Sequence, residues 1–139
     1  IWQIALWVFC LASLINISRY IYHKQPLINE GEFTSIMNTK ALQKSEYVIT
    51  FSNKYSPWLY GYTDKKIIAP GMFEHNKWNY AEWQVFWYGR DREKIIELLN
   101  RYNTPLYLFL NEYDVYWLSN FSNKPIFKKV DNHWYLFGE

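Results

Sequence analysis

The first 18 residues of the chain contain no charged side chain, and this feature constrains the fold more than any other. From Ile1 to Ser18 the residues Trp, Phe, Leu, Ile, Val and Ala dominate. As a helix, the stretch would be roughly 27 Å long at about 1.5 Å per residue. That length nearly crosses the hydrocarbon core of a bilayer.

Three interpretations of this stretch compete. A secretory signal peptide would need a basic start and a small-residue cleavage site, and neither is visible. A buried core helix is the second interpretation, but such helices rarely run so far without a charge. The third is a membrane span, which Trp2 and Tyr20 favour because Trp and Tyr collect at membrane interfaces. We expect a transmembrane helix over residues 1–24, the last span of a longer protein, followed by one domain over residues 25–139.

Charge and cysteine content exclude several classes of function for that domain. The net charge is +2, but without Arg19 and Lys24, which flank the apolar stretch, 13 basic residues face 13 acidic residues. A neutral domain argues against nucleic-acid binding. Cys10, the only cysteine, lies in the apolar stretch. Disulfides and cysteine-based metal sites are therefore excluded for the domain.

Apolar periodicity after residue 25 alternates between helix and strand patterns. The predicted strands cover residues 46–51, 65–71 and 105–110, and IFKKV and HWYLF form a closing hairpin around Asp131 and Asn132. The predicted helices cover residues 33–44 and 80–87, a segment capped by Asp91, and a segment capped by Asn111 and Asp114. Residues 52–64 are predicted as a loop with at most a turn of helix. The pattern predicts an α/β fold: a small three-layer, Rossmann-like, mainly parallel sheet with a C-terminal antiparallel pair.

Motifs that carry chemistry are scarce. The five glycines never cluster into a phosphate-binding loop. His23, His75 and His133 are scattered, and only His75 has an adjacent carboxylate, from Glu74. We therefore expect no catalytic residue, no metal and no cofactor in this segment.

Aromatic residues make up 22% of the chain, and they are densest from Tyr55 to Asp91. Loops that leave the carboxyl ends of parallel strands meet at one edge of a sheet, so this segment is the best candidate for a binding crevice. The candidate substrate-binding residues are Trp58, Tyr60, Tyr62, Glu74, His75 and Trp78. Trp58 or Tyr60 would stack on a sugar, and Glu74 or His75 would anchor it. The alternative is that Trp58 and Trp78 are packing residues.

The order of the elements resembles the C-terminal end of polytopic GT-C glycosyltransferases. A hydrophobic helix is followed by EYVITF, SPWLYGYTDKKIIAPG, an aromatic helix ending in FWYGRD, LLNRY leading into TPLYLFL, and the closing pair. The resemblance covers nearly the whole chain. It implies a membrane enzyme that uses a polyprenyl-phosphate-linked sugar, with its catalytic carboxylates upstream of this segment and with a divalent metal allowed there.

The resemblance further implies a multi-pass protein of the cell membrane with residues 25–139 on the extracytoplasmic side. Arg19 and Lys24 alone would favour the cytoplasmic side, since positive flanks tend to remain there. The expected partners are the bilayer, the upstream transmembrane domain of the same protein, and a lipid-linked sugar or glycan acceptor. The domain would bind the acceptor or shape the catalytic cavity. The alternative is a membrane-anchored, non-enzymatic binding or scaffold domain.

Overall fold

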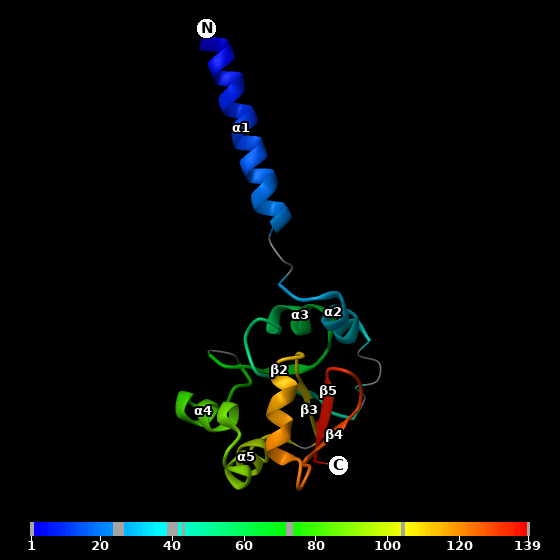
Figure 1. Cartoon of the computed structure of the whole chain (residues 1–139). Helices are drawn as coiled ribbons and strands as arrows, with labels where there is room; N and C mark the ends of the chain where they lie inside the picture. Colours follow the sequence, from blue (N-terminus) through cyan, green and yellow to red (C-terminus); the bar gives the residue numbers. More distant parts are fainter. Residues whose placement is uncertain are drawn as a thin grey trace.

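The computed structural model describes residues 2–23, 27–38, 42, 44–71, 74–103 and 105–138. The strands are β1 (Tyr47–Thr50), β2 (Lys66–Ile68), β3 (Leu106–Phe109), β4 (Phe127–Lys129) and β5 (Trp134–Phe137). The helices are α1 (Trp2–His23), α2 (Glu30–Met37), α3 (Ser56–Tyr62), α4 (Tyr80–Tyr88), α5 (Arg92–Leu99) and the 3₁₀ helix η2 (Asp114–Phe121). Figure 1 shows a body built around the sheet, with α1 extending away from it.

The charge-free stretch forms one continuous helix, α1. Its described side chains include exposed rings, with Trp7 at 70% and Phe9 at 71% exposure. Among the described residues, however, no helix is both long enough and apolar enough to cross a membrane, so the predicted transmembrane helix is wrong. The prediction equated lack of charge with apolarity, whereas a span needs about 20 predominantly apolar residues. Ser13 and Asn16 place hydroxyl and amide groups within the stretch.

The sheet is mixed, which corrects the prediction of a mainly parallel, Rossmann-like sheet. The strand order is β2-β1-β3-β5-β4. β1 pairs in parallel with β2 and with β3, whereas β5 pairs antiparallel with β3 and with β4. The predicted C-terminal hairpin is present, but β5 inserts beside β3 as an inner strand. Parallel and antiparallel pairings are therefore equal in number among the described strands.

Helices cover both faces of this sheet. α2 and α3 pack on the face that carries Val48 and Tyr107, and α4, α5 and η2 pack on the face that carries Ile49 and Leu108. β2 and β3 lie on opposite sides of β1. Right-handed crossovers from β1 to β2 and from β2 to β3 therefore need their helices on opposite faces. This rule places α3 on one face and α4 with α5 on the other.

Local capping explains where the helices begin. α2 begins at Glu30 rather than at the predicted Phe33, because Asn29 and Glu32 form a capping box. α3 replaces the predicted loop, and Pro57 in its first turn supplies a φ angle suited to a helix start. The predicted Asp91 cap is confirmed, since its Oδ1 accepts a hydrogen bond from the Lys94 amide at 3.1 Å.

Candidate ligand-binding site

The segments that follow β1 and β3 meet at the point where the strand order reverses, which is the usual ligand crevice of open α/β sheets. In this protein, side chains of the protein itself fill that point. Tyr55, which follows β1, is buried and donates a hydrogen bond from its hydroxyl to Glu32 Oε1 at 2.8 Å. Burial raises the pKa of the Tyr55 phenol, and the hydrogen bond to Glu32 raises it further. The phenol therefore remains a donor.

Glu32 joins α2 to α3. Its Oε2 accepts the Asn29 amide at 2.9 Å, and its Oε1 accepts the Tyr55 hydroxyl. The side chain is buried, so each carboxylate oxygen needs such a partner. Because Phe33 is the next residue along α2 and Trp58 lies on α3, this contact fixes the two rings relative to each other.

Asp114, at the start of η2, lies within electrostatic reach of Glu32. Burial raises the pKa of Asp114, and the Glu32 carboxylate raises it further, while a backbone hydrogen bond from Asn111 lowers it. The carboxyl groups of Glu32 and Asp114 therefore approach each other at the end of the crevice that Tyr55 fills, which we call the closed end.

Three rings on α2 and α3 form what we call the aromatic trio: Phe33, Trp58 and Tyr62. The Trp58 and Tyr62 rings lie nearly parallel, at 8°, with centroids 6.3 Å apart. Phe33 meets both edge-on, at 5.7 Å from Trp58 and 5.4 Å from Tyr62. Trp58 is partly buried, whereas Tyr62 is 46% exposed. The trio is thus a fixed aromatic surface that remains open to solvent.

A hollow of about 550 Å³, the apolar hollow, adjoins the trio. Its walls are Leu27, Ile28, Phe33 and Trp58, and its polar groups come from Asn29 and Glu30. The volume lies within the range of about 300 to 1,000 Å³ typical of ligand pockets. Apolar walls with few polar groups are also typical of such pockets.

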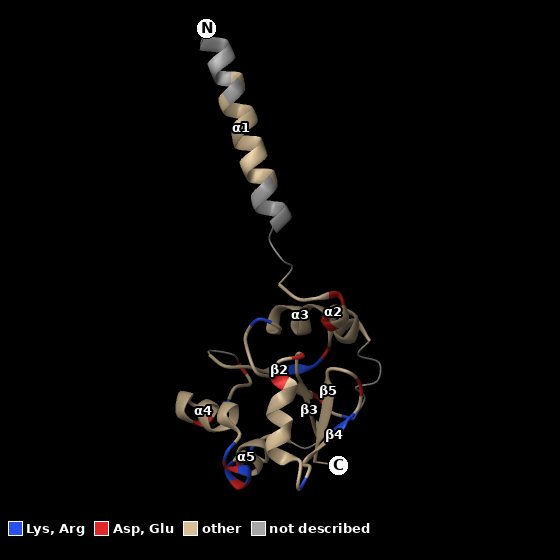
Figure 2. Cartoon of the chain, in the orientation of Figure 1, with Lys and Arg blue, Asp and Glu red and all other residues tan. Residues whose placement is uncertain are grey.

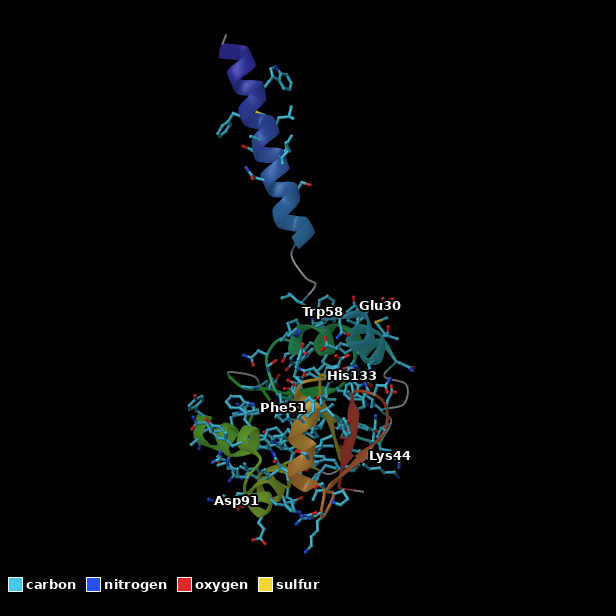
Figure 3. All side chains as sticks on the ribbon, in the orientation of Figure 1. Glu30, Lys44, Phe51, Trp58, Asp91 and His133 are labelled. Atoms are coloured by element: carbon cyan, nitrogen blue, oxygen red, sulfur yellow. The ribbon has the colours of Figure 1, made fainter. Side chains whose placement is uncertain are left out.

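A second hollow of about 560 Å³, the polar hollow, lies on the other side of Glu30. Its lining includes Glu30, Gly31, Ser35, Asp131 and His133. In Figure 3, Glu30 and Trp58 lie at the end of the body nearest α1, with His133 close to them. Glu30 lines both hollows, and we treat the two neighbouring hollows around the start of α2 as the candidate site.

The six residues predicted from the sequence lie in three places. Trp58 and Tyr62 belong to the aromatic trio. Tyr60 lies near Glu74: burial raises the pKa of Tyr60, and the Glu74 carboxylate raises it further. His75 lies 4.0 Å from Glu74, measured from Nε2 to Oε2, and meets the Tyr47 ring edge-on. Tyr60 lies on α3, Glu74 and His75 follow β2, and none of the three lines either hollow.

Trp78 lies in the core. It is 3% exposed, and its indole Nε1 donates a hydrogen bond to the Leu98 carbonyl at 3.1 Å. Its ring contacts those of Trp83, Phe86 and Tyr102. This position matches the packing alternative for Trp78 and leaves no face of the indole for a ligand.

Sequence reasoning missed Glu30, Phe33 and His133 as parts of the site. A local signal existed for the first two, because the Asn29-to-Glu32 capping pattern places the start of α2 at Glu30. No local signal existed for His133, which reaches the site only because β5 inserts beside β3.

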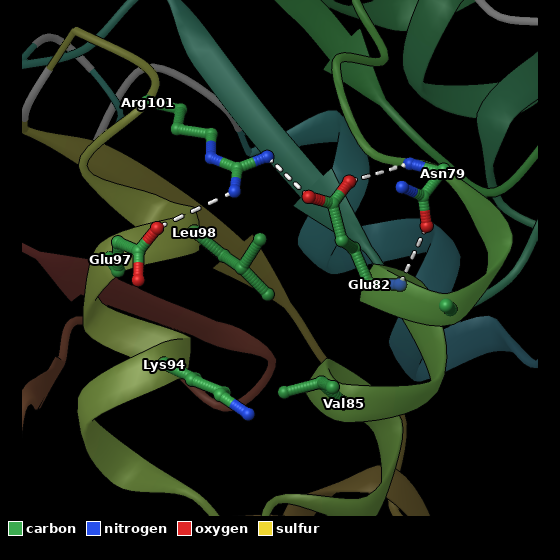
Figure 4. Close-up of a pocket in the computed structure, with 8 residues that line it drawn as sticks. Asn79, Glu82, Val85, Lys94, Glu97, Leu98 and Arg101 are labelled. Atoms are coloured by element: carbon green, nitrogen blue, oxygen red, sulfur yellow. Dashed lines mark hydrogen bonds and ion pairs between the residues drawn. The ribbon is translucent and has the colours of Figure 1, made fainter.

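A third hollow, between α4 and α5, has no comparable features. It encloses about 260 Å³, below the usual range of ligand pockets. Figure 4 shows its charges in contact: Arg101 binds both Glu82 and Glu97, and Glu82 caps α4 through Asn79. These contacts satisfy the charged groups structurally.

Metal binding finds no support in the part of the chain that the structure describes, where no three His, Cys, Asp or Glu residues could hold an ion together. The expectation that the domain holds no metal and no cofactor stays a prediction. A comparison with protein-family models, curated proteins and solved structures returns no match for this chain.

Proposed function

We propose that this chain contains a glycan-binding domain that presents an acceptor to a glycosyltransferase, with sugar transfer performed by residues outside the segment. The observation that carries the proposal is the aromatic trio beside two hollows that share Glu30. A sugar ring has an apolar C–H face and a polar rim of hydroxyls. Aromatic rings next to carboxylates and amides match both parts.

A neutral glycan fits this site better than a lipid-linked donor does. No Lys or Arg lines either hollow among the described residues, and Glu30 borders both. A polyprenyl phosphate would bring its negative charge next to that carboxylate, which is unfavourable. The charge of the site supports the acceptor role over a donor role, while the link to a glycosyltransferase comes from the resemblance in element order.

Titration calorimetry with cellobiose and with di-N-acetylchitobiose on the full chain tests the glycan-binding part. Trp58→Ala and Tyr62→Ala should each weaken binding at least about tenfold, a loss of about 1.4 kcal/mol. Tyr116→Ala is the matched control, because Tyr116 is 78% exposed and lies on η2, away from the trio. Binding that survives loss of both trio rings, or heat signals indistinguishable from buffer for both sugars, would overturn the proposal.

The enzymatic part has a separate test. The chain supplied with a lipid-linked sugar and an acceptor should release no transferred product, because catalysis is assigned elsewhere. Turnover by these 139 residues alone would contradict that assignment.

A further inference from the structure

The polar hollow contains two carboxylates that no cation of the described chain neutralises. Among the described residues, the exposed Glu30 makes no ion pair, and the half-buried Asp131 accepts only its neighbour's amide, that of Asn132, at 2.7 Å from its Oδ1. Several other carboxylates of the body form ion pairs, as Glu46 does with Lys66. In Figure 2, α2 carries acidic residues only, whereas α5 carries both signs. The hollow is thus a locally acidic region within a neutral body.

His133 adds an acceptor that is also without a partner. The side chain is 8% exposed, and its Nδ1 lies 2.8 Å from the Leu110 carbonyl oxygen. A carbonyl can only accept, so Nδ1 carries the proton. In the neutral ring, Nε2 then has a free lone pair. No described group bonds to Nε2, which lies 4.0 Å from the point that a Cβ on Gly31 would occupy.

Ser35 provides a second buried polar group at the same hollow. Its residue is 6% exposed, and its Oγ makes no hydrogen bond. A buried hydroxyl without a partner is uncommon and calls for an explanation. His133 Nε2, in contrast, is open to the hollow. An open imidazole lone pair beside two unpaired carboxylates suits a ligand that donates hydrogen bonds and carries positive charge.

We propose that the polar hollow binds a primary ammonium group. Ammonium has three N–H donors and no acceptor, which suits two carboxylates and the His133 Nε2 lone pair. Such hydrogen bonds between charged partners are stronger than neutral ones. An anion would lie next to two carboxylates with no Lys or Arg in the lining among the described residues, which is unfavourable.

An amino sugar and a simple amine could both supply this group. An amino sugar with its ring on the aromatic trio would place its amine near Glu30, and this identification rests on the proposed glycan-binding function. A simple amine would bind the hollow without the trio. Replacing Trp58 should therefore weaken binding of an amino sugar but not of a simple amine.

Calorimetric titration with chitosan disaccharide, which has free amines, and with cadaverine tests the proposal. Glu30→Gln combined with Asp131→Asn keeps the shape of the hollow and removes both charges. It should weaken binding of each amine at least about tenfold. The matched control is Glu93→Gln combined with Glu112→Gln, which removes the same charge, with Glu93 also in the first turn of a helix. This control should bind as the wild type does.

Gly31→Ala provides a second, independent variant. Its new methyl would lie 4.0 Å from His133 Nε2, within the polar hollow, and alanine favours a helix over glycine. Amine binding should fall while the protein unfolds at the same or a higher temperature. Gly61→Ala in α3 is the control, because a Cβ there meets nothing within 4 Å.

The outcomes separate the two proposals. Cadaverine binding that depends on Glu30 and Asp131 but not on Trp58 supports the ammonium site and leaves only the amino-sugar assignment without support. If neither amine binds, or if the double charge variant binds both as well as wild type does, the ammonium site is overturned. Cellobiose binding at the trio would stand in either case.

Discussion

The hollow between α4 and α5 and the two hollows beside α2 are bordered by similar helices. They differ in whether their charged side chains are paired with opposite charges. Between the former helices, Arg101 contacts both Glu82 and Glu97. Beside α2, Glu30 and Asp131 meet no cation among the described residues, and His133 Nε2 has no partner. Paired charges hold a structure together, whereas carboxylates without a cation beside an open imidazole nitrogen offer a place for a cationic ligand. This contrast, rather than hollow size, identifies the candidate site.

The largest test of the comparison uses one tryptophan from each region. Trp78→Ala should cost about 3 to 5 kcal/mol of unfolding free energy, because it leaves a cavity beneath α4 and α5. Trp58→Ala should cost clearly less, since its ring is partly exposed on α3. Urea unfolding of both variants measures the difference. Equal losses would mean that Trp58 is a core residue, and the aromatic trio would lose its role.

The contact between α2 and α3 is the second test. Tyr55→Phe removes the hydroxyl that Glu32 Oε1 accepts at 2.8 Å and leaves a buried carboxylate oxygen without this partner. We expect a loss of about 1.5 to 3 kcal/mol, the usual range for a hydrogen bond to a charged group. Urea unfolding supplies the value, and Tyr113→Phe, at an 84% exposed position, is the control. A neutral result for Tyr55→Phe would show that Glu32 does not hold the two helices together.

A smaller effect is expected in the region of paired charges between α4 and α5 when the pH falls. The Asn79 backbone amide and the Arg101 guanidinium hold the pKa of Glu82 below its usual 4.5. A lowered carboxyl pKa contributes stability that is present above the usual value and is lost as the pH falls through the folded-state pKa. The wild type should therefore be more stable than Glu82→Gln at neutral pH, and the gap should close below about pH 4. Thermal unfolding across this pH range checks the trend; a gap that widens in acid would contradict it.

The smallest expected effect is a pH dependence of stability with the opposite sign, and it concerns Asp114, close to Glu32 of α2. Burial raises the pKa of Asp114, so its ionised form opposes folding. The penalty is absent below the usual pKa of 3.8 and complete above the raised folded-state value. Asp114→Asn should gain stability relative to the wild type as the pH rises. If the relative stability of this variant stays flat from acid to neutral pH, the closed end of the crevice is better solvated than its burial indicates.

Features set by neighbouring residues were predictable. The Asp91 cap, the strands β1, β2 and β3 and the closing hairpin all follow from patterns within a few residues. The transmembrane helix was wrong because hydropathy depends on every residue, including Ser13 and Asn16, and not on charge alone. The sequence did not predict the full α3 because Gly61 and the aromatic residues around it are not typical of a helix. Tertiary packing of Leu59 stabilises this helix.

The sequence by itself determined the elements: a long helix that is uncharged up to Ser18, short apolar strands and capped helices between them. Only the tertiary structure decided which of their side chains meet. β5 could have continued an edge pair, but its insertion beside β3 brings His133 to α2 and makes the sheet mixed. Caps and periodicities act over three or four residues, so a sequence displays them directly. The meeting of Glu30, Trp58 and His133 depends on packing between segments that are far apart in the chain, and no local pattern encodes it.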